Sequence, residues 1–188
     1  MTDKLFMETS LRCKVMLLLI LSVIGGNTNA LELFGVDLQN SQRDELRRAA
    51  KKAGVKLIRE GGDGLWYDSY DSSAVLPLSQ RLYLGFVKQD KRFAFAEYVF
   101  VGFGHAQILR NLGQKYGRPD ITNGAYISDQ KYRWNQDGIE ISLYIDWNNY
   151  RTRLSYIEPV ALAALKKEQL AERSKLLPNK LAANFSVY

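Results

Sequence analysis

Residues 132–156, YRWNQDGIEISLYIDWNNYRTRLSY, decide the fold because two turn signals within them fix how three strands pair. Asp137-Gly138 is the strongest short hairpin signal, since both central residues of a type I′ turn need positive φ. Asn148-Asn149 supplies a second two-residue turn. The strands predicted around these turns are Tyr126–Asn135, Ile139–Trp147 and Tyr150–Ile157.

Both turns place the same apolar side chains on one face of the sheet. The predicted pairs are Gln136 with Ile139, Trp134 with Ile141, Tyr132 with Leu143, Trp147 with Tyr150, Ile145 with Thr152, Leu143 with Leu154, Ile141 with Tyr156 and Asp146 with Arg151. Because side chains alternate along a strand, a slip of one residue at either turn would mix the two faces. The opposite, polar face then carries Arg133, Ser142, Tyr144, Asp146, Arg151, Arg153 and Ser155.

The chain before this region has the same order of elements, a helix followed by an antiparallel meander. Apolar spacing predicts a helix at Arg43–Ala53, closed by Gly54 in a left-handed conformation, and a second helix at Gly104–Tyr116. The strands expected between them are Val55–Arg59, Leu65–Tyr70, Arg81–Val87 and Arg92–Phe100. We expect Leu84 opposite Phe95, Phe86 opposite Phe93, and a bulge or strand end at Glu97, where the alternation breaks.

An antiparallel sheet with one apolar face must cover that face. The sequence therefore predicts an α+β, two-layer sandwich in which two helices cover one face of a sheet of six to eight strands. The domain spans residues 31–158 in two helix-meander halves, 31–101 and 102–158. Residues 159–188 form a C-terminal helix, beginning at Pro159 and ending at Pro178, and a tail.

The first thirty residues are typical of a secretory signal peptide. Arg12 and Lys14 precede a ten-residue apolar run, Val15–Ile24, and small residues lead to a cleavage site after Ala30. About 20 apolar residues are needed to span a bilayer, so the ten-residue run is too short to be a spanning helix. We expect no integral membrane span after cleavage, and the alternative is that the segment is kept as an uncleaved anchor. The only cysteine is Cys13, so the exported chain has no disulfide, which favours a periplasmic location over a secreted one.

Charge does not point to nucleic acid. The 188-residue chain has a net charge of +6, and three basic and two acidic residues lie in the first thirty, which leaves +5. The basic residues are interleaved with acidic ones, as in residues 43–48, whereas nucleic-acid binding needs a basic stripe.

Few residues are available for catalysis. His105 is the only histidine, so zinc sites built from histidine and cysteine are excluded and no metal is expected. No nucleophile-elbow motif is present, and Gly61-Gly62-Asp63-Gly64 lacks the lysine of a phosphate-binding loop. We therefore expect no catalytic residues and no cofactor, and an enzyme is the less favoured class.

Two surfaces remain as binding candidates. Arginine and tyrosine are enriched at interface hot spots, which favours the polar face with Arg133, Tyr144, Arg151 and Arg153 as a surface for a protein or cell-envelope partner. The alternative is a carbohydrate site at Asp63, Trp66, Asp68 and Tyr70, which combines carboxylates with aromatic rings. A third hypothesis is an envelope structural protein whose C-terminal helix docks on a membrane or a partner.

The repeated helix-plus-meander order resembles the architecture of the β-lactamase inhibitory proteins, and one unit resembles the small lipoprotein of the outer-membrane barrel-assembly machinery. Residues 115–119, Trp134 and residues 139–156 are similar in layout to many uncharacterised periplasmic proteins. The resemblance implies this fold in an exported bacterial protein. The cysteine pairs of the inhibitory proteins and the lipid-bearing cysteine are absent, so no binding residue is carried over.

Overall fold

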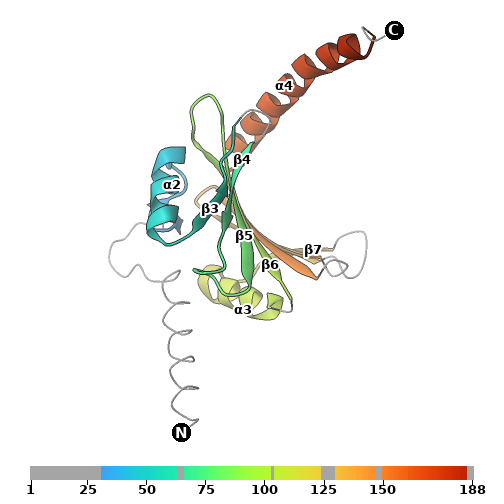
Figure 1. Ribbon diagram of the computed structural model, residues 1–188. Helices are drawn as coiled ribbons and strands as arrows, with labels where there is room; N and C mark the ends of the chain where they lie inside the picture. Colours follow the sequence, from blue (N-terminus) through green and yellow to red (C-terminus); the bar gives the residue numbers. More distant parts are fainter. Residues whose placement is uncertain (1–30, 63–65, 103, 124–129, 147–149, 186–188) are drawn as a thin grey trace.

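The computed structural model describes residues 31–62, 66–102, 104–123, 130–146 and 150–185, and within them an α+β fold around one antiparallel sheet (Figure 1). The helices are α2 (Arg43–Lys52), α3 (His105–Tyr116) and α4 (Pro159–Phe185). The sheet contains β3 (Lys56–Arg59), β4 (Tyr67–Asp71), β5 (Ser79–Phe86), β6 (Phe93–Val101), β7 (Asp120–Asn123), β8 (Gln130–Gln136), β9 (Ile139–Asp146) and β10 (Arg151–Ile157). A small hairpin, β1 (Glu32–Leu33) and β2 (Val36–Asp37), precedes α2. The predicted signal segment, residues 1–30, lies outside the described residues.

The sheet joins two four-stranded meanders through their last strands. Its order is β3-β4-β5-β6-β10-β9-β8-β7, so β6 pairs antiparallel with β10 at the centre. Each meander follows a helix, which confirms the predicted order of elements, and β7 adds one strand that the sequence pattern did not predict.

The predicted register of the second meander is confirmed. Asp137 and Gly138 have φ values of 50° and 81°, as a type I′ turn requires. The observed pairs include Gln136 with Ile139, Trp134 with Ile141, Tyr132 with Leu143, Ile145 with Thr152, Leu143 with Leu154, Ile141 with Tyr156 and Asp146 with Arg151. Asn148-Asn149 and the predicted pair of Trp147 with Tyr150 involve residues outside the described part of the chain.

The first meander differs from the prediction by one residue. Phe86 pairs with Phe93 as expected, but Leu84 pairs with Ala96 rather than with Phe95. The shift arises because Ala94 is an extra residue on β6, which lets the ring of Phe95 lie over Gly85. The bulge expected at Glu97 was wrong: Glu97 continues the strand and pairs with both Tyr83 and Ser155.

The main core lies between the sheet and the two helices α2 and α3. Leu46 and Ala50 of α2 and Leu112 of α3 belong to one buried cluster with the apolar face of the strands. Its central strand side chains include Leu82, Leu84, Tyr98, Ile141, Leu143 and Leu154. The Nε1–H of Trp134 donates to the carbonyl of Gly117 at 2.9 Å, which fixes the end of α3 to the sheet.

Helix α4 covers one end of the opposite face. Ala161 and Leu165 are fully buried in a second cluster with Val87 and Ala94, against which Phe95 also packs. Beyond this contact α4 projects away from the sheet (Figure 1) and continues to Phe185. The predicted end at Pro178 was wrong: a proline removes one helical hydrogen bond, but good helix formers flank it. No helix of the described residues is long and apolar enough to cross a membrane.

Candidate functional site

The candidate site is the polar face of the sheet that α2 and α3 leave uncovered, here called the open face. Its floor consists of Ser142 on β9 and Ser155 on β10, which are opposite each other and only 5% and 9% exposed. Longer side chains stand on either side in the same row across the sheet, Arg133 on β8 and Glu97 on β6. Small residues between long polar ones give a face with charged flanks and a low centre.

Two cations of the open face are held by carboxylates of the same face. Arg153 Nη1 lies 2.8 Å from Glu97 Oε1, and the hydroxyl of Ser155 donates to the other oxygen of Glu97 at 3.3 Å. Lys131 Nζ lies 3.3 Å from Glu140 Oε1. Because these groups are partly exposed, each pair contributes about 0–1 kcal/mol to stability, and its main effect is to orient the side chains.

The other two arginines of the predicted surface are not held by carboxylates of the described residues. Arg133, which is half-buried, and Arg151, which is exposed, form no salt bridge among the described residues. Asp146 is opposite Arg151 in register, as predicted. Tyr144 lies beside Arg153 on the neighbouring strand, so all four predicted residues lie on one face.

The carbohydrate candidate Asp68 lies on the other side of the sheet, beneath α2. Its side chain is fully buried. Oδ2 accepts from Arg47 Nε at 2.6 Å and Oδ1 accepts from Arg47 Nη2 at 2.7 Å, a bidentate ion pair. The N–H of Gly61 and Arg43 Nη2 also donate to Oδ1, at 2.7 and 3.3 Å, and the hydroxyl of Tyr70 donates to Oδ2 at 3.3 Å. Five donors thus occupy this carboxylate.

The electrostatics of this cluster follow from burial and pairing. Burial alone would raise the pKa of Asp68, but the hydrogen bonds from Arg47 and Gly61 outweigh it and lower the pKa below its usual value. Burial beside Asp68 raises the pKa of the Tyr70 hydroxyl, and the hydrogen bond to Asp68 raises that of Arg47. All three groups keep their ordinary charge states at neutral pH, which indicates a structural clamp on α2.

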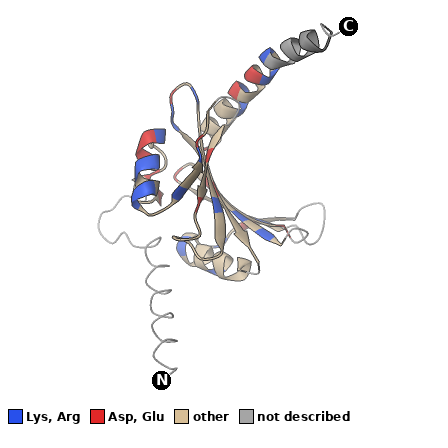
Figure 2. Cartoon of the chain, viewed as in Figure 1, with Lys and Arg blue, Asp and Glu red and all other residues tan. Residues whose placement is uncertain are grey.

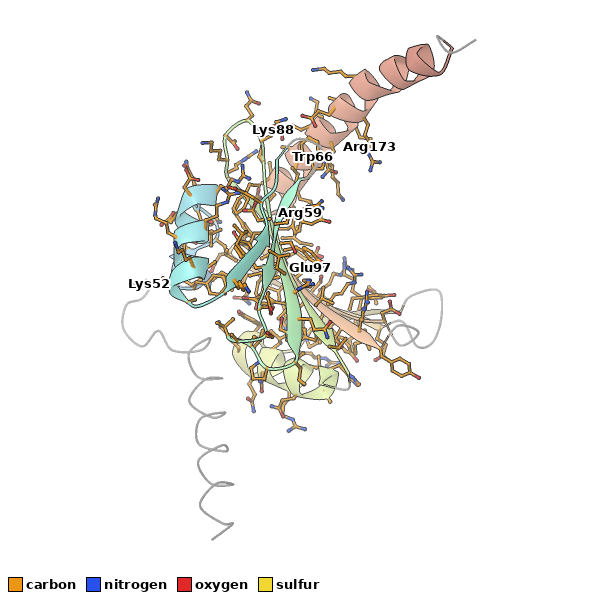
Figure 3. All side chains as sticks on the ribbon, in the orientation of Figure 1. Lys52, Arg59, Trp66, Lys88, Glu97 and Arg173 are labelled. Atoms are coloured by element: carbon orange, nitrogen blue, oxygen red, sulfur yellow. The ribbon has the colours of Figure 1, made fainter. Side chains whose placement is uncertain are left out.

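The rest of the carbohydrate set is dispersed. Trp66 packs against the second cluster at the base of α4, with Lys88 Nζ 5.7 Å from its ring centre (Figure 3). Tyr70 is buried in the main core, and Asp63 lies outside the described residues. Trp66 therefore packs at the base of α4, whereas Asp68 is buried beneath α2, so the structure does not bring the two side chains together.

His105 begins α3 and lines a shallow depression at the end of the sheet, together with Gly102, Asp146, Tyr150 and Arg151. No group of three or more His, Cys, Asp or Glu among the described residues could hold a metal ion.

The clamp at Asp68 and the anchor of α4 were not predicted. Arg43 and Arg47 are four residues apart and so share one face of α2, which is the signal that could have indicated a buried carboxylate opposite them. The anchor of α4 uses Glu168, whose carboxylate accepts from the backbone N–H groups of Lys88 and Gln89 at 2.8 and 3.1 Å. Nothing in the sequence spacing links residues that lie about eighty positions apart.

Comparisons with known proteins leave the family open. No family model matches the chain, and no curated protein matches it. Among solved structures, the chain is similar to a DUF4309 family protein, YjgB, from Bacillus subtilis subsp. subtilis str. 168, with a TM-score of 0.42 and 14% sequence identity. The similarity covers 68% of this chain and 88% of that one.

Proposed function

We propose that this chain is an exported, non-enzymatic protein-binding module that uses the open face of its sheet. The observation that carries the proposal is the pair Arg133 and Arg151, which form no salt bridge among the described residues and lie on a face that α2 and α3 do not cover. An arginine that forms no salt bridge with the described residues can bind a partner protein's carboxylate. Its planar guanidinium can form two hydrogen bonds with such a group.

The neighbouring residues suit a protein partner. Tyr144 contributes a rigid aromatic ring, and the ion pair with Glu97 pre-orients Arg153. Pre-oriented side chains lose less conformational entropy on binding, and Tyr and Arg are the residue types that dominate interface energetics. Figure 2 shows that positive charge is spread over the molecule rather than gathered in one block, so specificity would come from geometry rather than from total charge.

Site-specific photocrosslinking tests this proposal. A benzophenone amino acid at position 133 is compared with one at position 48, an exposed arginine on α2. We expect position 133 to yield a protein adduct in cell envelopes that position 48 does not yield. That adduct should disappear in the variant Arg153→Glu and persist in the matched control Arg110→Glu on α3. Identical adducts from both positions, or persistence in Arg153→Glu, would contradict the assignment of the face.

Export is a part of the proposal that rests on residues 1–30 alone. We expect the mature protein to begin at Leu31 and to fractionate with the periplasm, and N-terminal sequencing of the purified protein checks the first point. A mature chain that retains residues 1–30 would instead indicate an uncleaved anchor. The resemblance to β-lactamase inhibitory proteins stays a prediction and supplies no partner.

The projection of α4 favours a second candidate, in which this helix docks on another envelope component. The first half of α4 is anchored to the β5–β6 hairpin through Leu165 and Glu168, whereas Leu170 is 64% exposed. Vesicle flotation of the full chain, compared with a chain ending at Glu172, separates the two candidates. Loss of flotation on truncation would support a role in which α4 docks on a membrane. If neither chain floats, docking of α4 on a membrane is contradicted.

A further inference from the structure

The strand register places a row of alternating cations across the open face. Lys131 on β8 is opposite Tyr144 on β9, which is opposite Arg153 on β10. Arg153 is opposite Val99 on β6, which is opposite Arg81 on β5. Neighbouring strands are about 4.8 Å apart, so the three cations recur about every 10 Å. The five positions of this row carry no carboxylate.

The carboxylates of the same face lie in other rows. Glu97 pairs with Arg153 from the adjacent row and Glu140 pairs with Lys131 from two rows away, while Asp120 and Asp146 are opposite Arg133 and Arg151. Beyond Arg81, the carboxylate of Asp71 accepts hydrogen bonds from Ser73 N and Oγ at 3.0 and 2.6 Å, and the charge of Arg81 also helps to lower its pKa. Arg81 itself is exposed and forms no salt bridge among the described residues. The row thus carries three regularly spaced cations, two of them paired with carboxylates from other rows, with an aromatic and an aliphatic side chain between them.

We infer that this row binds an acidic polypeptide segment in the polyproline II conformation, with a carboxylate at every third residue. This inference rests on the proposed function and names the chemistry of the partner. A polyproline II helix has three residues per turn and rises about 3.1 Å per residue, so residues i and i+3 share a face about 9.3 Å apart. That spacing matches the cations of the row. A β-strand does not match, because its same-face residues recur about every 6.8 Å.

The side chains between the cations fit the same ligand. Tyr144, which is partly exposed, would contact the residues between the acidic ones, whereas Val99 is only 8% exposed and offers little surface. Proline rings pack well on tyrosine in grooves that recognise the polyproline II conformation. Arg153 is already oriented by Glu97, and it would share its guanidinium between Glu97 and the ligand's carboxylate.

Calorimetry with synthetic peptides tests this inference on the full mature chain. The probe is a twelve-residue repeat of Glu-Pro-Pro, and its controls are the Gln-Pro-Pro repeat and a scrambled peptide of the same charge. The measurements use physiological salt, where the Debye length of about 8 Å is shorter than the spacing of the cations. We expect the Glu-Pro-Pro repeat to bind at least tenfold more tightly than either control.

Variants of the row locate the binding. Arg81→Gln should weaken binding of the Glu-Pro-Pro repeat about tenfold, and Arg153→Gln by a similar factor, while the matched control Arg110→Gln on α3 should leave it unchanged. Arg81 is exposed and forms no salt bridge among the described residues, so we expect Arg81→Gln to leave the fold intact. Equal binding of the glutamate and glutamine repeats, or tighter binding of dextran sulfate with no effect of Arg81→Gln, would overturn the inference. The crosslink at position 133 would still stand in that case, so the two failures are distinguishable.

Discussion

The carboxylate of Asp68 lies fully inside the molecule, where its two oxygens accept hydrogen bonds from five donors. Removing a carboxylate from such a cluster leaves Arg47, whose side chain is 22% exposed, with a largely buried positive charge and only Glu60 as a partner. Breaking a buried ion pair in this way is far more costly than the pair itself is stabilising. The effect is therefore structural, and it acts on the attachment of α2.

We predict that Asp68→Asn lowers the free energy of unfolding by about 3–5 kcal/mol, because the amide cannot satisfy both donors of Arg47 and carries no charge. Urea denaturation followed by far-ultraviolet circular dichroism measures the loss. The matched control is Asp71→Asn on the same strand, where the side chain is partly exposed and bonds only locally to Ser73. That control should change stability by less than about 1 kcal/mol. Equal losses in the two variants would contradict the buried clamp.

The pH dependence of stability should report the same residue. The pKa of Asp68 in the folded state is lower than in the unfolded chain, where it is about 3.9. The unfolded state therefore binds more protons between the two pKa values, so stability rises with pH in that window. The contribution is fully present above about pH 4 and is lost as the pH falls through the folded pKa. We predict a flatter acid limb for Asp68→Asn than for the wild type, measured as unfolding free energy between about pH 2 and pH 5.

At the level of elements, the turn residues made the strand register of the second meander predictable. The register of the first meander was harder to predict, because it depends on how the side chain of Phe95 is accommodated. Asp137-Gly138 permits one conformation, and its register follows by counting. In the first meander the four-residue turn after Val87 leaves the register open, and Ala94 is inserted as an extra residue. The cause lies in Phe95, whose ring needs the space above a residue with no side chain, and only Gly85 supplies it.

Substitution of Gly85 tests this explanation of the bulge. A Cβ atom at this position would lie 2.0 Å from Phe95 Cε1, so Gly85→Ala forces the ring toward α4. We predict a loss of about 1–3 kcal/mol by urea denaturation. The double variant Gly85→Ala/Phe95→Leu should lose less than the sum of the single losses, because leucine leaves the space open. Strict additivity would show that the ring does not determine the bulge.

The control for backbone effects is Gly113→Ala. Gly113 lies within α3, and no atom lies within 4 Å of the position that its Cβ would occupy. Alanine is a better helix former than glycine by about 1 kcal/mol, so this variant should stabilise the protein. The opposite signs expected at Gly85 and Gly113 separate a steric clash from the general effect of replacing glycine.

For the whole molecule, the sequence predicted the layers of helices and sheet but not the contacts between segments that are far apart in the sequence. Strand alternation and helix spacing were enough to place α2 and α3 on the apolar face, because those patterns are local. The attachment of α4 was not accessible, since Leu165 and Glu168 meet the β5–β6 hairpin through contacts with no periodic signature. The residues of the open face were predicted one by one from the strand register. Which cation each carboxylate of that face pairs with depends on side-chain rotamers, which only the structure gives.

Truncation of α4 separates its anchored half from its projecting half. A chain ending at Glu172 keeps the burial of Ala161 and Leu165 and the bonds of Glu168, so its melting temperature should lie within about 2 °C of the full chain. A chain ending at Glu158 exposes Val87 and Ala94 and loses a fully buried leucine, which alone is worth about 2–5 kcal/mol. Because about 1 kcal/mol shifts the melting temperature of a domain of this size by about 2–4 °C, the shorter chain should melt at least about 4 °C lower in calorimetry. A large loss already at Glu172 would mean that the projecting half folds back on the sheet, and it would then compete with any partner of the open face.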